Sequence, residues 1–177
     1  MVSSHTRDRD AAAAPPQGRY RIDPARSQVS FRTRHLFGLA AVAGTMAIRS
    51  GEVVIGDPGA MSTVIVVLDA GSFHTSNFRR DTDVCSPRFL HVEDHPTITF
   101  TASGLRPDGD TWSLPGELTV RGTDSPVELH VTELRVTEGA LHARASVRVD
   151  RYALGVTAAK GMAVRHLDIN MTITGPR

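Results

Sequence analysis

The sequence has a single cysteine, Cys85, and a single lysine, Lys160, among its 177 residues. One cysteine cannot form a disulfide within the chain, and it excludes a structural zinc site held by several cysteines. The 20 basic residues are balanced by 19 acidic ones, so the whole chain has no field that would attract nucleic acid. Composition therefore argues against a disulfide scaffold and against a nucleic-acid partner.

The sequence also lacks long apolar runs. No stretch is long and apolar enough to cross a membrane, so we expect no integral membrane span. Residues 1–19 are too weakly apolar for the core of a signal peptide, and their charges, alanines and prolines predict a disordered tail. We therefore expect one domain at 20–177 and a cytoplasmic location.

Alternation of apolar and polar residues is the main pattern that is present. In residues 27–35, Val29, Phe31 and His35 fall on one face, which is the period of a half-buried β-strand. Similar segments follow along the chain and are separated by turns rich in glycine, proline and aspartate. The expected strands are 20–23, 28–35, 42–55, 63–70, 97–103, 112–122, 127–137, 141–150 and 165–174. Such a series predicts an all-β antiparallel barrel or sandwich.

One strand changes phase in its middle. Leu129 and Val131 share one phase, whereas Leu134 and Val136 have the opposite phase. A one-residue β-bulge near Thr132-Glu133 would return the second pair to the inner face.

Residues 71–96 interrupt the β pattern. Ser76 or Asn77 is suited to cap a short helix over Phe78–Cys85, and Pro87 is suited to the first turn of a second helix. We expect this segment, around 76–92, to form a helical lid at the mouth of a barrel.

The predicted inner face is mostly aliphatic, and Ala143 and Ala145 are small residues in mid-strand. An eight-stranded barrel is just wide enough either to be filled by side chains or to hold one small ligand. Small residues favour an apolar void, but bulky neighbours opposite the alanines would give a dry core instead. The candidates for ligand contact are Phe31, His35, Met46, Val66, Phe78, Arg80, Phe100, Ala143, Ala145, Val147, Ile169 and Met171.

Several polar candidates have two interpretations. His35 either donates to a polar head group or is satisfied by a backbone carbonyl. Arg80 either pairs with a head group at the mouth or forms a salt bridge with a carboxylate, whereas Asp81 is expected to anchor the helix. Arg151 is expected to hold the loop 152–164 in place.

No metal, cofactor or catalytic residue is predicted. His91, Glu93, Asp94 and His95 are metal-ligand types, but their spacing matches no established site, and Pro96 follows directly. No third group is evident that would orient a histidine beside Cys85 for nucleophilic catalysis.

Several motifs, in order, resemble the YceI-like proteins. They are Tyr20-x-Ile22-Asp23-Pro24-x-x-Ser27-x-Val29-x-Phe31-x-x-x-His35, Val42-x-Gly44-Thr45-Met46, Phe73-His74-Thr75-Ser76-Asn77-x-x-Arg80-Asp81, Ser86-Pro87-Arg88-Phe89-Leu90, His95-Pro96-Thr97-Ile98-Thr99-Phe100, Gly116-Glu117-Leu118-Thr119-Val120-Arg121-Gly122 with Pro126-Val127, and Asp150-Arg151-Tyr152-x-x-Gly155-Val156. The resemblance covers about 20–174. The sequence departs from the family where Arg88, Leu90 and His91 replace an acidic and aromatic run.

This resemblance implies an extended eight-stranded antiparallel lipocalin-like barrel that holds a long amphiphile. Our first hypothesis is a binding or carrier protein for a polyisoprenoid or isoprenoid quinone, not an enzyme. One alternative is an enzyme that modifies such a lipid, with His35 or His74 as acid-base. Another is a ligand-free barrel that acts as an interaction module. The expected partner is a long-chain isoprenoid or lipid, and a homodimer is left open.

Overall fold

The computed structural model describes residues 16–35, 40–57 and 62–177. The predicted tail up to residue 15 and the side chain of His35 lie outside the described part. The strands are β1 (Gly18–Arg21), β2 (Gln28–His35), β3 (Ala40–Met46), β4 (Ile48–Ile55), β5 (Thr63–Asp69), β6 (Thr97–Ser103), β7 (Arg106–Asp108), β8 (Thr111–Val120), β9 (Thr123–Thr137), β10 (Ala140–Asp150) and β11 (His166–Pro176). The helices are the one-turn η2 (Ala70–Ser72) and α1 (Phe78–Cys85).

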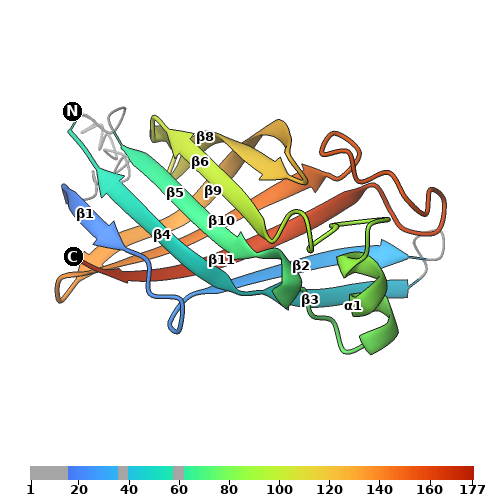
Figure 1. Ribbon diagram of the computed structural model, residues 1–177. Coiled ribbons are helices and arrows are strands. Elements are labelled where there is room, and N and C mark those ends of the chain that lie inside the picture. Colours follow the sequence, from blue (N-terminus) through green and yellow to red (C-terminus); the bar gives the residue numbers. More distant parts are fainter. Residues whose placement is uncertain (1–15, 36–39, 58–61) are drawn as a thin grey trace, which may run out of the picture.

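The strands form one antiparallel sheet that curls into a half-barrel (Figure 1). Their order is β1-β4-β5-β6-β8-β9-β10-β11-β2-β3, with β7 paired to β8 beside this path. The fold is all-β and lipocalin-like, as predicted, but the expected count of eight strands is wrong.

Two interruptions explain why the main path has ten strands, and β7, which was not predicted, is an additional strand. Ala47 alone separates β3 from β4, which sequence alternation had joined as one strand. Residues 22–27 separate β1 from β2, and there the N–H of Ile22 donates to Gly51 and that of Asp23 to Thr174, both at 2.9 Å. If β1 and β2 were one continuous strand, and β3 and β4 another, the path would have eight strands instead of ten.

The predicted bulge on β9 is confirmed. Glu133 pairs with Arg144 and Val131 pairs with Ala145, so Thr132 is the extra residue between them. The bulge lets Leu129, Val131 and Leu134 all face the interior, where they line one apolar pocket.

The predicted helix over Phe78–Cys85 is also confirmed, and Asn77 caps it by accepting from the N–H of Arg80 at 3.0 Å. The second helix predicted at Pro87 is wrong, because residues 86–94 form turns. His91 has a φ of +50°, which is incompatible with a right-handed helix. Within the described ranges, no helix is long and apolar enough to cross a membrane.

The two ends of the half-barrel differ. At one end Tyr20, Ile55 and Leu141 form a buried cluster, and the side chains of Tyr20 and Leu141 are almost completely enclosed. At the other end lie α1 and the loop that joins β10 to β11, away from β1 and the C-terminus (Figure 1). The first end is therefore occupied by packed side chains.

Candidate ligand-binding cavity

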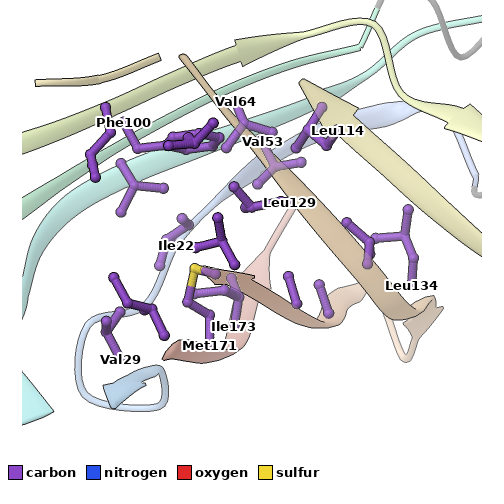
Figure 2. A pocket seen from close by; sticks show the side chains of 18 of the residues that line it. Ile22, Val29, Val53, Val64, Phe100, Leu114, Leu129, Leu134, Met171 and Ile173 are labelled. Carbon is purple, nitrogen blue, oxygen red and sulfur yellow. The ribbon is translucent and has the colours of Figure 1, made fainter. Parts of the chain in front are cut away.

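A pocket of about 130 Å³ lies in the interior of the curled sheet. All of its lining side chains are apolar, and they come from strands on every side of the interior. Figure 2 shows these side chains converging, with the sulfur of Met171 as the only heteroatom drawn among the sticks. We call this space the deep pocket.

A larger cavity of about 670 Å³ lies next to it, toward α1 and the loop after β10. The two spaces share wall residues, which are Val29, Leu68, Ile98, Leu118 and Ile169. We call the second space the large cavity. The interior therefore contains unfilled space rather than the filled core that the sequence had left open, and the two spaces are adjacent.

Most of the predicted contact residues lie on these walls. Those in the deep pocket are Val66, Phe100, Ala143, Ala145, Val147, Ile169 and Met171, and those in the large cavity are Phe31, Met46, Arg80 and Ile169. Phe78 lines neither space and is 86% exposed. The side chain of His35 is outside the described part. Contact of any of these residues with a ligand stays a prediction.

Ala143 and Ala145 show how the deep pocket arises. They face Ile173 and Met171 of β11 on one side, and Leu134 and Val131 of β9 on the other. Protein interiors are normally close-packed. The methyl side chains of Ala143 and Ala145 are too short to fill the space between their larger neighbours, so a pocket remains.

Of the two spaces, only the large cavity has polar lining residues. They are Thr33, Asn77, Arg79, Arg80, Asp83 and Arg151. Asp83 lies 3.6 Å from Arg88, and Arg80 donates to the Thr75 hydroxyl at 3.3 Å. A chain-like ligand would therefore find apolar walls in the deep pocket and hydrogen-bonding groups in the large cavity.

The loop after β10 forms part of the wall of the large cavity. Arg151 is only 7% exposed, and its guanidinium donates to the carbonyls of Val156, Ala158, Ala163 and Val164 at 2.7–2.9 Å. The predicted role of Arg151 in holding this loop is confirmed.

The apolar residues that this loop contributes were not predicted. Those that line the large cavity are Leu154, Val156, Ala159, Met162, Ala163 and Val164. The sequence signal that could have indicated this wall is the high proportion of apolar residues in a segment without the alternation of a strand.

Asp81 anchors α1 to the chain before it, as expected. Its carboxylate accepts from the Thr75 hydroxyl at 2.6 Å and from the Thr75 N–H at 3.0 Å. Burial by itself would raise the pKa of Asp81, but the Thr75 hydrogen bonds, together with His74 and Arg80, hold that pKa below its ordinary value. The carboxylate is therefore an ionised structural anchor.

Among the described residues, those considered for catalysis or metal binding do not form a metal site or line the two spaces. His74 is largely exposed, lies 3.3 Å from Asp81 and lines neither space. His91 contacts Asp94 at 3.2 Å. In the part of the chain that the structure describes, no three histidine, cysteine or acidic residues are grouped to hold a metal ion.

A curled antiparallel sheet around an apolar interior, with a helix and a loop at its open end, defines a lipocalin-like all-β protein. The chain belongs to the family of proteins with a YceI-like domain, which matches residues 20–174.

Among curated relatives, the chain is 31% identical over 102 residues to a UPF0312 protein of Pectobacterium atrosepticum, covering 57% of this chain and 53% of the relative. It is 32% identical over 113 residues to protein YceI of Shigella flexneri, covering 62% and 59%. The chain thus spans little more than half the length of these relatives.

Two solved structures share the fold at low identity. BcnA of Burkholderia cenocepacia superposes with a TM-score of 0.76 at 18% identity, covering 86% of this chain and 98% of that one. A polyisoprenoid binding domain from Saccharophagus degradans gives a TM-score of 0.65 at 12% identity, covering 89% and 97%. At such identities the likeness shows the fold alone.

Proposed function

We propose that this protein binds and carries a long-chain amphiphile, a polyisoprenoid or an isoprenoid quinone, with the chain inside the curled sheet. The observation that carries the proposal is the pair of adjacent spaces inside the sheet, whose linings are mostly apolar and share five residues. The family membership and the polyisoprenoid-binding domain from Saccharophagus degradans support it.

The arrangement of polar groups supports one orientation of the ligand. The deep pocket offers no polar side chain, whereas Asn77, Arg79, Arg80 and Arg151 lie around the large cavity. A polar group buried without a partner costs free energy, so the apolar end of the ligand enters first and its head stays near α1. Ile169 is one of the five residues that line both spaces.

The residues that line the two spaces support binding rather than catalysis. Among the described residues of the two walls there is no histidine, cysteine or serine. The one wall carboxylate, Asp83, lies beside Arg88. General acid-base or nucleophilic chemistry needs a positioned group of that kind within hydrogen-bond reach of the substrate.

A series of ligands with one head group and increasing alkyl chain length tests the proposal. Burial of each CH₂ contributes about 0.8 kcal/mol, so Kd should fall about fourfold per added CH₂ until the interior is full. Isothermal titration calorimetry on the delipidated full chain measures this. A Kd that does not change with chain length would contradict binding in the apolar interior.

A further inference from the structure

Large apolar side chains are exposed on two different elements at the open end. In the part of the chain that the structure describes, the exposed large apolar residues are Phe78 at 86%, Met162 at 61% and Ile65 at 50%. Met162 belongs to the loop after β10 and lines the large cavity, and Phe78 lies on α1 directly beside the lining residues Asn77 and Arg79. Single exposed apolar residues are common, but these two lie on the two elements, α1 and the loop after β10, that both line the large cavity.

The same end has a positive balance of charge. Arg79, Arg80 and the buried Arg151 line the large cavity together with one carboxylate, Asp83, which lies 3.6 Å from Arg88. The carboxylate of Asp81 also acts on Arg80. Lys160 is exposed on the loop, with its ammonium 5.4 Å from the centre of the Tyr152 ring. The exposed acids that follow α1, Glu93 and Asp94, are not part of the lining.

We propose that this end of the half-barrel docks on the surface of an anionic lipid bilayer. Phe78 and Met162 enter the boundary between head groups and acyl chains, and Arg79 and Lys160 face the anionic head groups. The inference rests on the proposed function, because a long apolar chain that passes directly from a bilayer into the large cavity avoids transfer through water. Such a transfer requires the docking surface to lie beside the large cavity. Phe78, Met162 and the positive charge lie on α1 and on the loop after β10, which line that cavity.

Vesicle flotation of the full chain tests the docking surface. Vesicles of equal parts phosphatidylcholine and phosphatidylglycerol are compared with vesicles of phosphatidylcholine alone. We expect binding to the anionic vesicles that weakens as salt is raised, because exposed charges are screened. Phe78→Ser should bind these vesicles about tenfold more weakly, as expected for the loss of one inserted aromatic side chain.

Two further variants separate the contributions. Ile65→Ser is the matched control, because Ile65 is exposed on β5 and lines neither space, and its vesicle binding should equal that of the wild type. Lys160→Gln should weaken binding to anionic vesicles about fivefold and leave the weak binding to phosphatidylcholine unchanged. Equal losses for Phe78→Ser and Ile65→Ser would overturn the assignment of the docking surface.

The experiment distinguishes a failure of the docking from a failure of the proposed function. Phe78→Ser should keep the wild-type affinity for a short-chain amphiphile in the absence of vesicles, because Phe78 lines neither space. A wild-type protein that binds the amphiphile but neither kind of vesicle overturns the docking and points to delivery by another protein. Vesicle binding without amphiphile binding overturns the proposed function and leaves the docking intact.

Discussion

At the scale of single residues, Arg151 carries a positive charge in the wall of an apolar cavity. No carboxylate forms an ion pair with it among the described residues, and four backbone carbonyls of its own loop accept its hydrogen bonds. Burial lowers the pKa of this guanidinium, although Tyr152 and Asp150 act in the opposite direction. Arg151 is therefore a structural support that gives the loop after β10 a fixed shape.

We predict that Arg151→Met lowers the free energy of unfolding by about 2–4 kcal/mol, because it leaves buried carbonyls without donors. Urea unfolding measures the loss. Arg148→Gln is the control, since Arg148 is exposed and its ion pair with Asp168, at 3.5 Å, lies at the surface. Equal losses in the two variants would contradict the role given to Arg151.

At the scale of elements, the loop after β10 is closed by an ion pair where it meets the sheet. Arg165 donates to Asp150 at 2.6 Å and 2.9 Å. The hydrogen bonds from Arg165 lower the pKa of Asp150 from 3.8 to about 2, against a smaller opposing effect of burial and with help from the Tyr152 N–H. A carboxyl group whose pKa is lower in the folded state stabilises the fold at pH values above its pKa in the unfolded state. This contribution is lost as the pH falls toward its pKa in the folded state.

We therefore predict that the wild type loses more stability than Asp150→Asn as the pH falls from 3.8 to about 2. Above this window the wild type should be the more stable of the two. Thermal unfolding across the range measures the difference, and the lowered pKa values of Asp81 and Glu133 act equally in both proteins. Parallel curves for the two proteins would show that the ion pair does not shift the pKa of Asp150.

The strand β10 shapes the deep pocket through its small residues. We predict that Ala145→Phe fills this pocket, so that the longest alkyl ligands bind at least about tenfold more weakly while the shortest ligands bind as before. Calorimetry with the chain-length series measures both. Ala153→Phe is the control, because Ala153 is exposed and lines neither space. A uniform loss across all chain lengths would show that the deep pocket does not hold the end of the chain.

At the scale of the whole molecule, the strands could be predicted because alternation directly reports which side chains face inward. The helix α1 was predictable from its cap at Asn77, and the bulge at Thr132 from a change of phase. The break at Ala47 was not predictable, since alternation continues across it. A cytoplasmic location stays a prediction from the sequence, and the sequence leaves a homodimer open.

The cavities themselves depend on information that one sequence does not contain. The alternation places Ala143 and Ala145 inward, but whether neighbours fill the space beside them depends on how β9, β10 and β11 pack. The loop wall was missed because Leu154, Val156 and Met162 follow no period and are positioned by the hydrogen bonds of Arg151.

The central claim is that the interior holds a long apolar chain, and native mass spectrometry of the protein purified from its own cells without detergent tests it most directly. We predict a mass above that of the chain alone, which returns to the chain mass after extraction with organic solvent and releases a long-chain amphiphile. A protein that carries only its own mass, and that neither binds nor is stabilised by added long-chain amphiphiles, would contradict the account.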